Sequence, residues 1–138
     1  MKKLFSTSYS ASSFNFGLLL LRLALGVLMA HSGYYKLTHF NEILNGPQGF
    51  MNFMGLGAST SLALLVFAEF FCAILVALGM VTRLATIPLI IACSVALFKA
   101  HNSDVFGQGQ LITLYLAGYI TILFVGPGKI SVDGMIGK

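Results

Sequence analysis

Four apolar stretches, separated by polar or glycine-containing segments, dominate the pattern of hydrophobic and polar positions along this 138-residue chain. They cover residues 14–37, 59–80, 82–100 and 110–125. An apolar helix needs about 20 residues to cross the roughly 30 Å hydrocarbon core of a bilayer. The first three stretches have about that length, and the last is slightly shorter. The pattern therefore predicts an all-α protein, a four-helix transmembrane bundle.

The segments around these stretches complete the predicted organisation. Residues 1–13 are polar and rich in serine, which indicates an N-terminal tail before a single transmembrane domain over residues 14–138. The linker over residues 38–57 is apolar in its second half, which is expected to lie on the bilayer surface. Only a tight turn precedes Thr82, so the second and third helices are predicted to form an antiparallel hairpin. The run Gly126-Pro127-Gly128 ends the fourth helix.

Composition supports a membrane protein. The chain is 57% hydrophobic and 9% charged, with a mean hydropathy of +0.90, whereas soluble domains contain about 25% charged residues. The net charge of +4 includes no basic cluster longer than Lys2-Lys3, so the lipid bilayer is the expected partner and nucleic acid is not. Cys72 and Cys93 lie in different stretches and form no C-x-x-C motif, so they are interpreted as buried apolar residues.

The distribution of basic residues predicts the orientation. Four helices place both termini on one side of the membrane, and five basic residues flank that side: Lys2, Lys3, Arg83, Lys129 and Lys138. The opposite side has Lys36 and Lys99. Because positive charge favours the inside, both termini are predicted to be cytoplasmic. Arg22 interrupts the first apolar run and no small-residue cleavage site follows, so this helix is expected to be retained rather than removed as a signal peptide.

Two charged residues fall well inside the predicted spans. An ionisable group there costs about 2.5–3.5 kcal/mol on insertion scales, so it needs a partner or a function. Arg22 lies about 12 Å from the cytoplasmic end of its helix and Glu69 about 15 Å from the opposite end of the next one. These similar depths predict a buried Arg22–Glu69 ion pair, either structural or functional. If the two are not partners, Arg83 or Lys36 is the next candidate for Glu69.

A second polar group is predicted near the outer face. His31, Lys36 and His39 lie in or just after the end of the first helix, and His101 and Asp104 follow the third helix at the same side. Histidine and lysine can donate hydrogen bonds to a carbonyl or carboxylate, so His31, Lys36 and His101 are candidates for a quinone or small-anion site. The alternative, that these histidines simply occupy a wet boundary, stays open. No H-x-x-x-H or H-E-x-x-H spacing is present, so no metal site is predicted.

Small residues recur at helical spacing within the predicted spans. Gly26 and Gly33 share one face of the first helix, and Ala73 and Ala77 share one face of the second. Helices in membranes approach closely at such positions because small side chains leave the backbones accessible. We interpret these stripes as packing surfaces.

The order and spacing of several motifs resemble the DoxX family. Arg22-x3-Gly26 followed by His31-x-Gly33-x2-Lys36 is similar to the first helix of that family. The resemblance covers about residues 16–136, through Leu56-Gly57, Glu69, Gly79, Thr82-Arg83, His101, Gly126-Pro127-Gly128 and Ser131-x-Asp133. It implies a small four-helix protein of the bacterial inner membrane.

The resemblance also implies a function, because the family takes its name from a subunit associated with thiosulfate:quinone oxidoreductase. The expected role is an accessory or anchor subunit of a quinone-linked oxidoreductase system, bound to a redox partner protein. The alternative is a small transporter, or a membrane protein that binds lipid or another small molecule. No catalytic residue is assigned and no intrinsic cofactor is expected, with quinone as the candidate ligand. Gln108 and Gln110 stand where family members often have an acid, and self-association is left open.

Overall fold

The computed structural model describes residues 6–46, 55, 57–100, 106–107 and 109–136, and these residues are mostly helical with no strand among them. The all-α prediction is therefore confirmed. The helices are α1 (Ala11–Thr38), α2 (Phe40–Leu44), α3 (Ala58–Val66), η3 (Phe67–Cys72), α4 (Ala73–Leu78), α5 (Thr82–Val95), η4 (Ala96–Ala100), α6 (Gln110–Val125) and α7 (Val132–Ile136). The segments η3 and η4 are π-helical, so α3–η3–α4 is one continuous helix and η4 extends α5.

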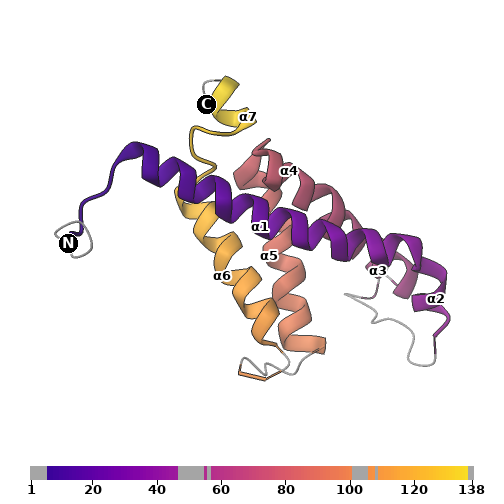
Figure 1. Ribbon diagram of the computed structural model, residues 1–138. Coiled ribbons are helices and arrows are strands. Elements are labelled where there is room, and N and C mark those ends of the chain that lie inside the picture. The colour runs from indigo at the N-terminus through magenta and orange to yellow at the C-terminus, as the bar shows by residue number, and fades with distance from the viewer. Residues whose placement is uncertain (1–5, 47–54, 56, 101–105, 108, 137–138) are drawn as a thin grey trace.

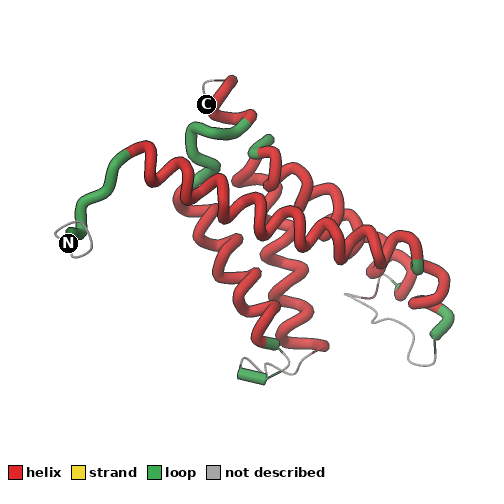
Figure 2. The backbone as a smooth tube through the Cα atoms, in the orientation of Figure 1, coloured by secondary structure: helices red, strands yellow, loops and turns green. Residues whose placement is uncertain are grey.

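The long helices form two antiparallel pairs (Figure 1). In one pair α1 packs along η3 and α4, and in the other α5 packs along α6. The two pairs come together near the turn between α4 and α5, and they diverge towards their opposite ends (Figure 2). The structure is therefore a splayed arrangement of two helical hairpins, with α1 at a large angle to α6.

Local capping explains where the helices begin and end. The Ser10 hydroxyl accepts a hydrogen bond of 3.2 Å from the amide of Ser13, which caps α1 and lets it start before the predicted position. At the other end of the first hairpin, Gly79 adopts a left-handed conformation with φ of +78°. The amide of Met80 donates to the Leu75 carbonyl at 2.9 Å, which closes α4 in a tight C-terminal turn.

Glycines bring α1 into direct contact with the neighbouring helix. A Cβ atom on Gly26 would lie 2.7 Å from the carbonyl oxygen of Ala73 and from the Cβ of Ala77. A Cβ atom on Gly33 would lie 2.7 Å from the backbone of Glu69. Such distances are too short for any side chain, so the packing role predicted for these glycines and alanines is confirmed. The contact also fixes the register between α1 and η3–α4.

The surface of the structure is apolar along every long helix. Large side chains with more than half of their surface exposed include Leu20, Leu84, Leu114 and Phe124. By length and composition, Ala11–Thr38 and Ala58–Leu78 are long enough to cross a membrane, whereas Thr82–Phe98 and Gln110–Val125 are shorter apolar helices. Cys72 and Cys93 are both buried as free thiols in the core.

Candidate functional site

A buried ion pair joins α1 to the π-helical segment η3. The ammonium of Lys36 donates to both carboxylate oxygens of Glu69, at 2.9 Å and 2.8 Å. Glu69 retains only 7% of its surface exposed, whereas the side chain of Lys36 is 30% exposed. The carboxylate thus lies inside the protein and the ammonium reaches it from the edge.

Helix geometry explains why these two side chains meet. Gly33 lets the backbone of α1 touch the backbone of η3 at Glu69, and Lys36 lies one turn further along α1. Side chains on a helix lean towards its N-terminus. The Lys36 side chain therefore points towards the N-terminus of α1, which is the direction of Glu69. Because the two helices are antiparallel, the Glu69 side chain points the opposite way, towards Lys36. Glu69 also lies in the first turn of η3, and π-helical segments are frequent at functional sites.

The predicted Arg22–Glu69 pair is wrong in this structure, because Glu69 is bound by Lys36 and Arg22 binds backbone carbonyls instead. In the observed register Glu69 faces Gly33, which lies eleven residues, or about 16 Å, further along α1 than Arg22. Both side chains also lean towards the N-termini of their own helices, which carries them away from each other. The depth of a residue below the end of its own helix does not determine how two helices are aligned along their axes, and this alignment decides which side chains meet.

Arg22, near the middle of α1, is instead buried against the C-terminal end of α4. Its side chain is only 1% exposed. Nη1 donates to the carbonyls of Val76 and Ala77 at 3.4 Å and 3.3 Å, and Nη2 donates to the carbonyl of Ile130. The C-terminal carbonyls of a helix lack intrahelical partners and carry partial negative charge. Arg22 therefore provides hydrogen-bond donors for the carbonyls at the end of α4 and connects this end to the segment before α7.

Asp133 completes the connection between the C-terminal segment and the hairpin. Its carboxylate accepts hydrogen bonds of 2.9 Å from the amides of Val81 and Thr82, and one of 3.0 Å from the Thr82 hydroxyl. The amide of Asp133 donates to the carbonyl of Gly79 at 2.9 Å. Asp133 thus caps the N-terminus of α5 from a distant part of the chain. The sequence reasoning gave Asp133 no role of its own, and only its place in the family motif indicated that it mattered.

Of the predicted histidine–lysine layer, the structure describes only the part on and after α1, and there it does not bring His31 to Lys36. His31 is exposed on α1, and its separation of five positions from Lys36 places it about 140° around the helix axis. His39 contacts the Tyr35 carbonyl through Nδ1 at 2.9 Å and stacks on the Tyr35 ring. His101, the third member of the predicted quinone site, lies outside the described residues, as do Asp104 and Gln108.

Behind Glu69 lies a core built by the other helices. Cys93 of α5 and both Tyr115 and Tyr119 of α6 are buried, and they belong to the same core cluster as Cys72 of η3. The Tyr119 hydroxyl donates to the Leu25 carbonyl of α1 at 3.0 Å. The ion pair therefore lies at the edge of a core to which all four long helices contribute.

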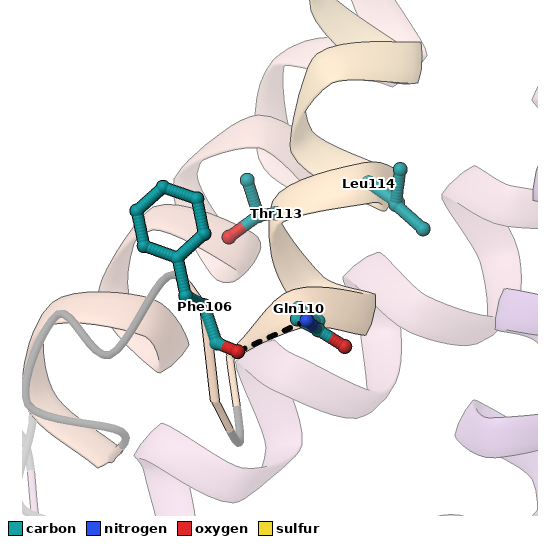
Figure 3. Close-up of a pocket in the computed structure, with 4 residues that line it drawn as sticks. All are labelled: Phe106, Gln110, Thr113 and Leu114. Atoms are coloured by element: carbon teal, nitrogen blue, oxygen red, sulfur yellow. Dashed lines mark hydrogen bonds between the residues drawn. The ribbon is translucent and has the colours of Figure 1, made fainter.

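An open hollow of about 340 Å³ near the start of α6 shares no residue with the ion pair. It is lined by Phe106, Gln110, Thr113 and Leu114 (Figure 3). Gln110 donates to the Phe106 carbonyl at 2.9 Å, so its amide serves the local turn. Within the part of the chain that the structure describes, no group of three metal-ligating side chains could hold a metal ion.

The helices, their apolar surface and the buried charges define an all-helical membrane protein. A sequence model of the DoxX family matches residues 17–102, and the chain belongs to this family. The matched region contains Arg22, the glycines of α1, the Lys36–Glu69 pair and Thr82. No curated protein and no solved structure gives a match.

Proposed function

We propose that this DoxX family protein is a four-helix bundle in the bacterial inner membrane, and that it is an accessory or anchor subunit of a quinone-linked oxidoreductase system. One observation carries the proposal. The long helices expose apolar side chains, while the charged groups Arg22, Lys36 and Glu69 are bound by partners within the chain. A protein built in this way is suited to hold a partner in the bilayer.

Helix lengths support four membrane crossings. At 1.5 Å per residue, α5 with η4 is about 28 Å long and α6 about 24 Å, against a hydrocarbon core of roughly 30 Å. Local thinning of the bilayer accommodates a helix that is a few ångströms short. The 28 residues of α1 extend about 42 Å, and a helix of this length crosses the bilayer at a tilt.

Electron transfer in this proposal relies on the partner. In this proposal the redox cofactor belongs to the partner protein, and a quinone is the mobile carrier dissolved in the bilayer. The subunit then contributes position and stability to the complex. A homo-oligomer of the subunit within that complex is compatible with its exposed apolar faces.

The test is purification of the tagged full-length chain in a mild detergent, followed by mass spectrometry of bound proteins and quinones. We expect an oxidoreductase subunit to co-purify, and we expect quinone reduction by membranes to fall when the chain is deleted. Complementation with the wild-type chain should restore the rate. Purification without any oxidoreductase, together with an unchanged rate of quinone reduction in the deletion strain, would contradict the proposal.

A second candidate function rests on the Lys36–Glu69 pair. A buried carboxylate covered by a partly exposed ammonium can exchange its partner for a polar small molecule, and ionisable groups within spans often mark transport or binding sites. In this case the variant Lys36→Met should abolish uptake or binding while complex assembly is retained. Loss of assembly with this variant would favour the accessory-subunit function.

A further inference from the structure

The C-terminal segment after α6 exposes apolar side chains beyond the last long helix. Within seven residues, Ile130, Met135 and Ile136 are 47%, 83% and 64% exposed. We call residues 129–136 the C-terminal clip. Apolar side chains concentrated on such a short segment are unfavourable in water, and they indicate a covered surface.

The C-terminal clip is held in a fixed place. Asp133 binds Val81 and Thr82, Arg22 binds the Ile130 carbonyl, and the Lys129 amide donates to the Asn15 side chain at 3.0 Å. In Figure 1, α7 lies beyond the ends of α4 and α6, across the end of the bundle. The fold therefore holds the exposed apolar side chains together at one position along the long helices, at the end where α4 and α6 terminate.

In the proposed membrane embedding, that position coincides with the boundary of the bilayer. Because α6 is about 24 Å long and the hydrocarbon core is roughly 30 Å thick, the end of α6 lies at the edge of the core. Only residues 126–131 separate α6 from α7, so the clip lies at the depth of the lipid headgroups. A position at this depth places apolar side chains against acyl chains and leaves polar backbone in the hydrated layer.

Charge at this end of the bundle complements anionic lipid. Arg83 and Lys129 are both exposed, and the Arg83 guanidinium lies beside Gly126 and donates to the Phe124 carbonyl at 3.4 Å. The carboxylate of Asp133 is bound to the start of α5. Apolar groups flanked by cations are typical of segments that bind the surface of anionic membranes.

We propose that the C-terminal clip is an interfacial anchor, with Ile130, Met135 and Ile136 inserted among lipid acyl chains and with Lys129 and Arg83 bound to the phosphates of anionic phospholipids. This inference rests on the proposed membrane embedding and is independent of the redox role. The occupant of the clip surface is lipid rather than a protein partner.

The absence of tryptophan from the chain allows a direct test, in which Met135→Trp is the only indole reporter. The full-length variant is placed in nanodiscs of phosphatidylcholine with increasing fractions of phosphatidylglycerol. We expect blue-shifted emission, quenching by lipids brominated near the headgroup, and protection from aqueous iodide. Adding Lys129→Gln should weaken the response to phosphatidylglycerol about fivefold, as expected for the loss of one cation near an anionic surface.

Leu114→Trp is the matched control, because Leu114 is 68% exposed on α6. This reporter should be quenched by lipids brominated on their acyl chains and should not respond to phosphatidylglycerol or to Lys129→Gln, because it lies at the other end of α6. Ile136→Trp is a second reporter for the clip if the first variant folds poorly.

Emission typical of water and full quenching by iodide at both clip positions would overturn the proposal, and so would protection from both iodide and brominated lipids, which would indicate a protein cover. If Leu114→Trp reports lipid while the clip reports water, the membrane embedding stands and only the anchor is rejected.

Discussion

Individual charged residues in this protein find partners that suit their chemistry. The Lys36 ammonium spans both oxygens of the Glu69 carboxylate, so an anion and a cation neutralise each other where water is scarce. The Arg22 guanidinium, with five donors in a planar fork, contacts three carbonyls from two segments. The two terminal nitrogens of the fork donate to different segments, Nη1 to α4 and Nη2 to the carbonyl of Ile130, whereas a lysine would have to reach both from a single nitrogen.

The Lys36–Glu69 pair makes a quantitative prediction. Lys36→Met and Glu69→Gln should each lower the free energy of unfolding in detergent, because each leaves a charge or polar group without its partner. The double variant should recover part of the loss, with a coupling energy of about 1–3 kcal/mol. Thermal unfolding of the four proteins in the same micelles measures this coupling.

The same cycle with Arg22→Met in place of Lys36→Met is the control. Arg22 lies about 16 Å from Glu69 along the helix axis, so the effects of Arg22→Met and Glu69→Gln should add within about 0.5 kcal/mol. Strong coupling between Arg22 and Glu69, combined with additivity for Lys36, would contradict the observed register.

At the scale of helices, one close contact positions the ion pair. Gly33 allows the backbones of α1 and η3 to touch, and this contact determines that Lys36 lies within reach of Glu69. The π-helical turn of η3 contributes as well, because it changes the direction in which Glu69 projects relative to a regular α-helix.

The substitution Gly33→Ala should separate α1 from η3. The added Cβ would lie 2.7 Å from the Glu69 and Phe70 backbone, and neither backbone can move without disturbing its helix. Gly17→Ala is the matched control, since nothing lies within 4 Å of its Cβ position. We expect Gly33→Ala to lower the thermal unfolding temperature and Gly17→Ala to raise or preserve it, because alanine favours a helix by about 1 kcal/mol over glycine. Equal effects of the two substitutions would refute the close contact.

The connection between α5 and the C-terminal clip can be tested through backbone exchange. Asp133→Ala removes the acceptor for the amides of Val81 and Thr82, which should cost about 0.5–2 kcal/mol, as for other helix caps. Hydrogen exchange at those two amides should accelerate, whereas exchange in the middle of α6 should not. Asp133→Asn keeps one acceptor oxygen and should have a smaller effect. Unchanged exchange in Asp133→Ala would show that α5 does not depend on this cap.

The whole molecule brings the start of α1 and the C-terminal segment to the same end. The Asn15 side chain accepts a hydrogen bond from the Lys129 amide, and Arg22 and Asp133 hold the same segment against the α4–α5 turn. The exposed cations Arg83 and Lys129 are also at this end. These cations therefore give the part of the protein that the structure describes a polarity of charge along its length.

This polarity predicts that both termini face the cytoplasm, because basic residues favour the inner side of the membrane. A reporter protein that works only in the cytoplasm should be active when it is fused after Lys138. A reporter protein that works only in the periplasm should be active when it is inserted within residues 40–57. A fusion after Lys138 with periplasmic activity would reverse the orientation. In that case the Lys36–Glu69 pair would open towards the cytoplasmic leaflet.

The sequence by itself determined the helical elements. Apolar runs of sufficient length, the turn at Gly79 and the break at Gly126 are local features, and the observed α6 covers the same residues, 110–125, as the fourth apolar stretch. The small-residue contacts of Gly26 and Gly33 followed from helical spacing alone. Buried charges were also recognisable, because any ionisable residue inside an apolar run requires a partner.

Only the tertiary structure decided which partners those charges have. A helix carries no local signal for its register against a neighbour, and a shift of about 21 Å along the axis, the rise over the 14 residues between them, exchanges Arg22 for Lys36 as the partner of Glu69. The same holds for Asp133, whose contacts with Val81 and Thr82 join segments about 50 residues apart. Side chains on antiparallel helices lean in opposite directions, and this separates Arg22 from Glu69 and brings Lys36 to Glu69. For this physical reason, spacing in the sequence identified the buried charges but paired them incorrectly.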